Sequence, residues 1–307
     1  MRIVVAIGGN ALIAAEEDGA WHSQLTHARE VAEEVVALRA AGHALVLTHG
    51  NGPQVGALAL QQESGEVPAL PLDALTAMTQ GQIGYLLETA IGSVDRAVPT
   101  ATLLTRVVVA RDDPAFARPT KPVGPFYAPD EARRLAVERG WAVADDAGRG
   151  WRRVVPSPRP VEVVGAQNVR TLVDAGVLVI AGGGGGVPVT AAHEGLAGVV
   201  DKDRCSAELA LAVGADLLVL LTGVPRVALD YGTRWERELE RITVSAAERA
   251  LAEGEFPAGS MGPKIESARR FVEGGGRAVI TTAGRLRAAV EGEDGTWVVA
   301  DREAVSA

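Results

Sequence analysis

Three lysines are the residues whose type and placement most clearly indicate chemistry. The 307-residue sequence holds 30 Lys and Arg residues together, and only Lys121, Lys202 and Lys264 are lysines. They occur in TKPVGP, VVDKDRC and SMGPKIE, where the Gly, Pro and Asp neighbours are typical of loops and turns. An ammonium group is a compact charge on a flexible stem, whereas a guanidinium is a planar fork. Lysines kept in an arginine-rich chain therefore favour phosphate chemistry, in which one cation must follow a moving oxygen, over random retention.

Glycine-rich turns supply the second kind of candidate site. GGNA (8–11) and HGNGPQVG (49–56) each follow a predicted strand, and consecutive backbone amides at a helix start can cradle an anion. One such turn alone is as easily an ordinary connection, but two together favour anion binding. GGGGGVPV (182–189) follows a third strand, where a phosphate or another backbone could approach closely. The chain has no GxGxxG and no GxxxxGK followed by Ser or Thr, so neither a Rossmann nor a Walker site is supported.

Charged residues also mark the starts of two predicted helices. Asp201 and Asp203 flank Lys202, and helix capping alone explains the two acids but does not require the lysine. An aspartate beside a lysine can hold its ammonium group in position. Lys264 follows a proline that suits a first helical turn, where a cation is unfavourable, which indicates an anionic ligand nearby. Cys205 is expected to be a small apolar residue rather than a nucleophile.

The sequence offers no convincing general base and no zinc site. The five histidines include no HExxH pair, and His49, which precedes GNG, is expected to form a structural hydrogen bond or to touch substrate. A carboxylate or carbamate acceptor is already ionised near neutral pH and requires no base. Catalysis would then consist of positioning and charge stabilisation by glycine amides, three ammonium groups and Mg²⁺.

The elements that must position these residues alternate along the chain. Continuous apolar runs that end near glycine predict buried strands at 3–7, 44–49, 177–181 and 215–222. Helical patterns cover 23–42, 166–176, 203–214 and 263–276, the last followed by another strand. This alternation predicts a parallel α/β sheet whose ligands bind beyond the carboxyl ends of the strands.

One region interrupts the alternation. Residues 111–160 are rich in Pro, Gly and charge and include Lys121, which predicts a small subdomain projecting over the site. The net charge of -9 and pI near 5.2 argue against nucleic-acid binding. A single cysteine excludes an internal disulfide, and no apolar run reaches the roughly 18 residues that cross a bilayer, so we expect a cytoplasmic protein with no membrane or nucleic-acid partner.

Eight motifs, in order from residue 3 to about 285, closely resemble the carbamate kinases of the amino acid kinase superfamily. They read AIGGNAL, VLTHGNGPQVG, PLDALTAMTQGQIGY, PTKPVGPFY, DAGRGWRRVVPSP, VIAGGGGGVPV, VVDKDRCSAELA and AGSMGPKIESARRFV. The resemblance implies a homodimeric three-layer αβα sandwich with a mainly parallel central sheet. It also implies Mg²⁺-dependent, reversible phosphoryl transfer between ATP and carbamate, in arginine metabolism.

The resemblance further implies a single domain over 1–307 with two lobes. The N-lobe, about 1–214, would bind carbamate and carry the protruding subdomain at about 112–160, and the C-lobe, about 215–307, would bind nucleotide. Carbamate and the transferring group would lie against Gly8, Gly9, Asn10, Gly50, Asn51 and Gly52. The catalytic set would be Lys121, Lys202, Asp203 and Lys264. The nucleotide would contact Gly184, Thr222, Gly223, Met261 and Lys264, and its phosphates, rather than protein ligands, would carry Mg²⁺.

One segment departs from the family pattern. The family usually reads something like LTDVDxVY where this chain has LTGVPRVALDYG (221–232), on what would be the nucleotide-base side of the cleft. Two other hypotheses therefore stay open. The first is a related acyl-phosphate kinase acting on another small carboxylate. The second is a nucleotide-binding regulatory module without turnover.

Overall fold

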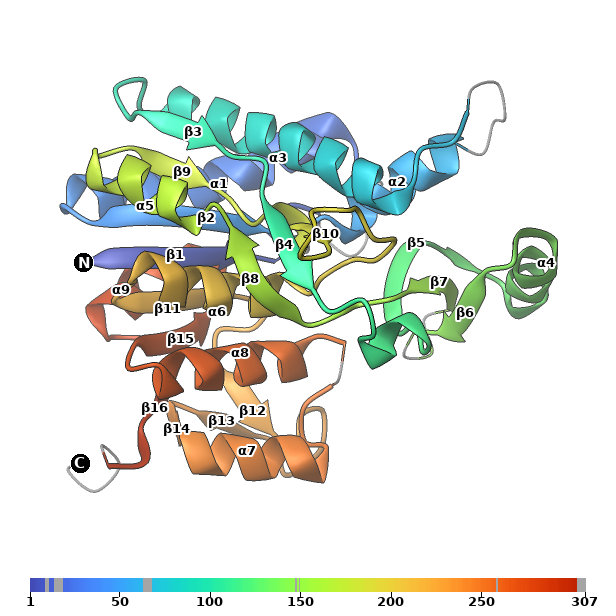
Figure 1. Cartoon of the computed structure of the whole chain (residues 1–307). Coiled ribbons are helices and arrows are strands. Elements are labelled where there is room, and N and C mark those ends of the chain that lie inside the picture. The colour runs from blue at the N-terminus through green and yellow to red at the C-terminus, as the bar shows by residue number, and fades with distance from the viewer. Residues whose placement is uncertain are drawn as a thin grey trace.

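A large mainly parallel sheet forms the centre of the computed structural model, which describes residues 1–8, 11–13, 19–62, 68–146, 148, 150–257 and 259–302. Within these residues the sheet has the spatial order β14-β16-β15-β11-β1-β2-β9-β3 (Figure 1). Only β15 and β16 run antiparallel to each other. The strand bounds are β1 Arg2–Ile7, β2 Ala44–His49, β3 Thr100–Thr102, β9 Leu178–Ile180, β11 Leu217–Leu221, β14 Arg241–Thr243, β15 Arg277–Thr281 and β16 Thr296–Val299.

Helices cover both faces of this sheet, because its strands are apolar on both sides. Along β1, Ile3, Val5 and Ile7 join one buried cluster, whereas Val4 and Ala6 join another, as the two-residue period of a strand requires. The first cluster includes residues of α1 Trp21–Ala40, α3 Leu72–Val94 and α9 Leu286–Glu291. The second includes residues of α5 Ala166–Asp174, α6 Lys202–Val213, α7 Val244–Glu253 and α8 Met261–Glu273. The predicted three-layer αβα sandwich is confirmed.

One smaller sheet and a hairpin complete the body around the site. A three-stranded sheet has the order β10-β4-β8, and a hairpin pairs β12 with β13. Their bounds are β4 Arg106–Val109, β8 Pro160–Val164, β10 Val187–Val189, β12 Val227–Leu229 and β13 Arg237–Leu239. Short 3₁₀ helices lie at η3 Pro114–Phe116, η4 Gly183–Gly185 and η5 Ala283–Arg285.

A separate sheet projects from the body, as the Pro- and Gly-rich region predicted. It has the order β5-β7-β6 and carries α4 at its far end (Figure 1). The bounds are β5 Lys121–Tyr127, α4 Pro129–Arg139, β6 Ala142–Asp145 and β7 Trp151–Val155. The strand β5 lies against α2 Gly52–Gln61, so the projecting sheet meets the body beside the HGNGPQVG turn.

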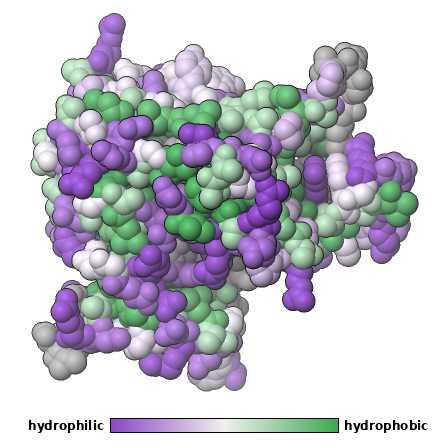
Figure 2. Space-filling model, viewed as in Figure 1, coloured by the Kyte–Doolittle hydropathy of each residue, from purple (hydrophilic) through white to green (hydrophobic). Residues whose placement is uncertain are grey.

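The surface is mixed in character. On the face shown in Figure 2, hydrophilic residues are spread over the body and the projecting sheet and interrupt the apolar ones. None of the described helices is both long and apolar enough to cross a membrane.

Candidate active site

A cavity of about 480 Å³ lies where the carboxyl ends of β1, β2, β11 and β15 meet the projecting sheet. The predicted site residues that line it are Gly8, Gly50, Asn51, Gly52, Lys121, Gly184, Lys202, Asp203, Thr222, Gly223 and Lys264. Met261, the first residue of α8, does not line it. Gly9 and Asn10 lie outside the described residues. Segments far apart in sequence therefore converge at the strand ends, where a parallel sheet binds its ligands.

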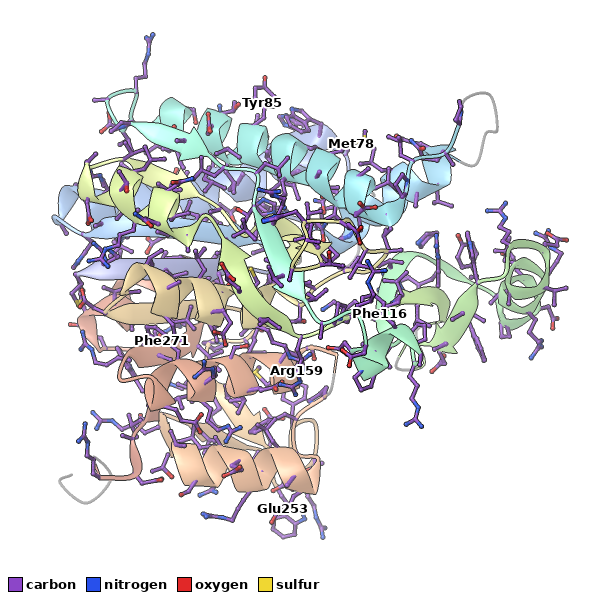
Figure 3. The ribbon with its side chains drawn as sticks, in the orientation of Figure 1. Met78, Tyr85, Phe116, Arg159, Glu253 and Phe271 are labelled. Atoms are coloured by element: carbon purple, nitrogen blue, oxygen red, sulfur yellow. The ribbon has the colours of Figure 1, made fainter. Side chains whose placement is uncertain are left out.

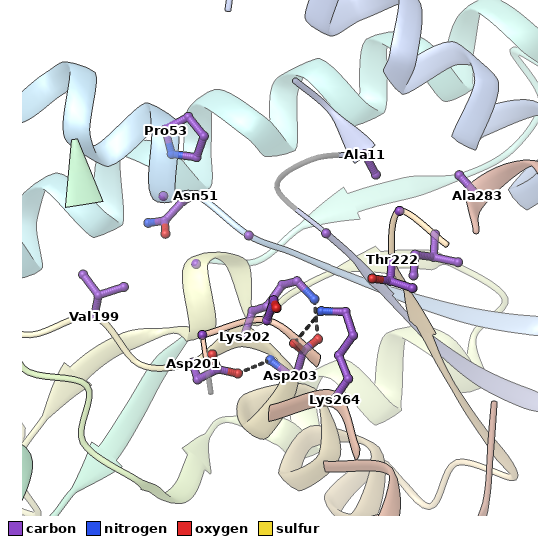
Figure 4. Close-up of a pocket in the computed structure, with 18 of the residues that line it drawn as sticks. Ala11, Asn51, Pro53, Val199, Asp201, Lys202, Asp203, Thr222, Lys264 and Ala283 are labelled. Atoms are coloured by element: carbon purple, nitrogen blue, oxygen red, sulfur yellow. Dashed lines mark hydrogen bonds and ion pairs between the residues drawn. The ribbon is translucent and has the colours of Figure 1, made fainter. Parts of the chain in front are cut away.

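Two of the three lysines meet at one carboxylate (Figure 4). Lys264 Nζ donates to Asp203 Oδ2 at 2.9 Å, and Lys202 donates to the other carboxylate oxygen of the same aspartate. Asp203 and Lys264 are only 3% and 8% exposed. The shared carboxylate holds both ammonium groups at the cavity, and its negative charge offsets the repulsion between them.

The third lysine belongs to the projecting sheet. Lys121 is the first residue of β5, and its Nζ lies 2.5 Å from Asp201 Oδ2. Asp201 is also the N-cap of α6, since its other oxygen accepts from the backbone N–H groups of Asp203 at 2.9 Å and Arg204 at 3.3 Å. The capping role expected from the sequence is confirmed. The ion pair with Lys121 was missed, because no local pattern links residues 80 positions apart.

The charges of this cluster are set by burial and by one another. Burial alone would raise the pKa of Asp201, but Lys121 and the two neighbouring ammonium groups hold that pKa below its usual range. Burial lowers the pKa of Lys202 to about 8, although Asp203 opposes the shift. Burial acts the same way on Lys264, but Asp203, together with Asp201, outweighs it and raises the pKa of that lysine. Three ammonium groups thus face two carboxylates, which leaves one positive charge for an anion.

The glycine run after β9 is explained by close packing. A Cβ on Gly184 would overlap the side-chain amide of Asn51, and one on Gly183 would overlap the ring of His49. Gly184 also has a φ of +61°, which disfavours larger residues. Asn51 in turn donates to Thr79 Oγ1 at 2.9 Å. The glycines therefore let η4 lie directly on the HGN turn and fix its asparagine at the cavity wall.

The remaining candidates have structural roles. His49 is buried, and its Nδ1 donates to the carbonyl of Gly50 at 2.9 Å. Burial lowers the pKa of His49 to about 4, so the ring is neutral at physiological pH, and it does not line the cavity. Burial, followed by the charge of Asp201, raises the pKa of the Cys205 thiol to about 12. The expectation that Cys205 is a small buried residue is confirmed.

The departing segment LTGVPRVALDYG touches the cavity at few positions. Where the family pattern has two acids and an aromatic residue, this chain has Gly223, Pro225, Arg226 and Ala228. Of these four, only Gly223 lines the cavity, and a Cβ there would meet open space. Arg226 is engaged elsewhere, since its guanidinium lies 3.0 Å from Glu240 and 3.5 Å from Asp294. Ala228 is buried in β12. The departures from the family pattern therefore affect the contacts that hold this loop in place more than the residues that line the cavity.

Comparisons with known proteins agree with this arrangement. Residues 1–282 match the model of the Amino acid kinase family. The chain is 44% identical to the carbamate kinase of Pyrococcus horikoshii and 46% identical to that of Thermococcus kodakarensis, in both cases over 97% of this chain and at least 98% of the relative. The solved structure of carbamate kinase from Giardia lamblia bound to AMP-PNP is 40% identical, with a TM-score of 0.89 and 98% of each chain covered. The chain belongs to the amino acid kinase family and, within it, to the carbamate kinases.

Proposed function

We propose that the protein is a carbamate kinase, which interconverts carbamoyl phosphate plus ADP with ATP plus carbamate. The observation that carries the proposal is the convergence of Lys121, Lys202 and Lys264 on one glycine-lined cavity. The relatives named above, which share more than two fifths of their residues with this chain, support the same activity.

The two sides of the cavity fit the two substrates. We assign carbamate to the backbone amides around Asn51, between the N-terminus of α2 and the η4 turn. We assign the nucleotide to the side formed by Thr222, Gly223 and Lys264. The Giardia lamblia carbamate kinase binds the nucleotide AMP-PNP, which supports a nucleotide as one of the two substrates. The predicted lobes, with carbamate in about 1–214 and nucleotide in about 215–307, follow the same division.

Transfer then consists of positioning and charge compensation. The phosphoryl group passes between two oxygens through a loose transition state, whose charge spreads over its equatorial oxygens. Lys202 and Lys264, joined by Asp203, are placed to neutralise that charge, and Lys121 closes the cavity from the side of the projecting sheet. The carbamate oxygen is already anionic, so the neutral His49 is not needed as a base.

Magnesium is proposed to enter with the nucleotide. In the described part of the chain, no group of three His, Cys, Asp or Glu side chains is arranged to hold a metal ion. The carboxylates of Asp201 and Asp203 are each already paired with lysine. This donor set fits an ion held by phosphate oxygens, where Mg²⁺ would supply further charge neutralisation.

A coupled assay tests the proposed function. We expect ATP to form from ADP and carbamoyl phosphate with Mg²⁺, and we expect chelation to stop turnover without lowering the melting temperature. Turnover with another acyl phosphate, but not with carbamoyl phosphate, would favour the related acyl-phosphate kinase. Calorimetric binding of ADP with no transfer to it would favour the regulatory module.

The fall of kcat/KM at alkaline pH is expected to reflect the loss of the proton from Lys202. Because burial lowers the pKa of this lysine to about 8, the free enzyme loses the ammonium charge as pH rises through that value. We expect kcat/KM for ADP to be constant below pH 7 and to fall about tenfold per pH unit well above 8. Lys202→Arg, whose guanidinium stays charged, should react more slowly but should not show this fall. A wild-type profile that stays flat to pH 9.5 contradicts the assignment.

A second copy of the chain is proposed to cover the outer side of α1 and α3. Met78 and Tyr85 lie seven residues apart on α3 (Figure 3), with side chains 45% and 64% exposed, and Trp21 of α1 stacks on Tyr85 with ring centroids 5.8 Å apart. Large apolar groups exposed together mark an interface. We expect a dimer by light scattering, and a monomer for Tyr85→Glu, with Tyr231→Glu as an exposed control. A monomeric wild type at micromolar concentration removes this proposal.

A cytoplasmic location and a part in arginine metabolism stay predictions from the sequence.

A further inference from the structure

Two glycines bring the projecting sheet unusually close to the body. Gly56 is buried in α2, and a Cβ added there would overlap the Cα and N atoms of Gly124 in β5. Gly124 has a φ of +76°, and the pairing of β5 with β7 shifts register between Val123 and Tyr127. The two backbones therefore touch at an irregular point of the strand, where only glycine permits the approach.

This contact joins two parts of the cavity wall. The helix α2 of the body starts at Gly52, and the strand β5 of the projecting sheet starts at Lys121. Both residues line the cavity. The glycine contact therefore lies one helical turn beyond Gly52 in α2 and three residues beyond Lys121 in β5. Any change in the separation of α2 and β5 moves Lys121 relative to Asn51.

The rest of the junction is small. Val123 is 3% exposed and packs in an apolar cluster of five buried residues, which is separate from the two main cores. Beyond it, the ion pair of Lys121 with Asp201 Oδ2, at 2.5 Å, ties the strand to the N-terminus of α6. This apolar cluster and the ion pair hold β5 near the body, and the glycine contact sets how closely its backbone can approach α2.

We propose that Gly56 and Gly124 are positioning residues that place the Lys121 ammonium at the cavity, an inference that rests on the proposed function. A methyl group at position 56 must separate β5 from α2 by more than about 1 Å to restore van der Waals separation. A displacement of that size costs about 10²-fold in rate when a reacting group is misplaced. The ion pair of Lys121 with Asp201 weakens with the same movement.

The test is a double-mutant cycle of Gly56→Ala and Lys121→Ala. We expect Gly56→Ala to lower kcat for ATP formation by about 10- to 100-fold, with little change in KM for ADP, which binds across the cavity. In the Lys121→Ala background, Gly56→Ala should have no further effect. Ala57→Ser, which adds one atom on the exposed side of the same helix, should match the wild type. An unchanged kcat in Gly56→Ala, or equal losses in both backgrounds, overturns the proposal.

A second readout does not depend on catalysis. Peptide-resolved acetylation should show Lys121 reacting several-fold faster in Gly56→Ala than in the wild type, while Lys264 stays protected. Should Gly56→Ala fail to fold, Val123→Ala loosens the same strand without adding bulk and should give a smaller kcat loss that also vanishes with Lys121→Ala. If the wild type does not use carbamoyl phosphate, the proposed function fails, whereas the acetylation result still decides the placement of Lys121.

Discussion

Lys264→Arg is expected to lower kcat by about 10²- to 10³-fold while leaving the fold intact. Lys264 is 8% exposed, and its Nζ lies 2.9 Å from Asp203 Oδ2. A guanidinium keeps the charge but is larger and planar, so it cannot occupy this buried position and donate from the same point. The effect therefore falls on transition-state stabilisation rather than on net charge.

Three variants separate shape from charge at this position. Lys264→Met removes the charge, and we expect it to lose about as much activity as Lys264→Arg. Arg270→Lys makes the reverse exchange on the exposed side of the same helix and should leave kcat unchanged. Circular dichroism melts check that all three variants fold. A kcat near that of the wild type in Lys264→Arg would refute the view that this cavity requires an ammonium group.

The sequence predicted the parts of the fold that have a local signature. Buried parallel strands are continuous apolar runs, so β1, β2, β9 and β11 were found close to their observed limits. The helix α1 was found from its apolar spacing and from Gly42, whose φ of +86° is that of a helix C-terminal glycine. The lysines were found because their loops carry Gly, Pro and Asp.

No local signal predicted α3 or the pairing of Lys121 with Asp201. The N-cap Pro71 of α3 makes no side-chain capping hydrogen bond, and the helix contains several glycines. At Gly84 a Cβ would overlap the side chain of Thr102, so this glycine is a packing requirement between elements and weakens the helical pattern. The Lys121 pair likewise exists only once β5 lies on α2. Both features depend on contacts between distant segments, which composition and spacing do not encode.

Asp203→Asn is expected to have the largest effect, because it removes the one carboxylate that two ammonium groups share. An amide oxygen carries no charge to offset Lys202 and Lys264, which already repel each other. Since Asp203 raises the pKa of Lys202 against its burial, that pKa should fall below about 8 in the variant, so the lysine should carry less charge at pH 7.5 than in the wild type. Breaking a buried pair on one side typically costs about 3–5 kcal/mol of stability, part of which is recovered when the lysine loses its proton.

The expected result is a kcat at pH 7.5 at least about 10³-fold below that of the wild type, with a partial recovery at pH 6. The recovery follows because a lysine with a lowered pKa regains its proton as the pH falls. Denaturant unfolding should show the stability loss, and Asp112→Asn, at an exposed position, serves as the control for the same chemical change. If Asp203→Asn kept the wild-type kcat across this pH range, Asp203 would not be the residue that keeps Lys202 and Lys264 charged and close together. The proposed charge-compensation mechanism would then be wrong.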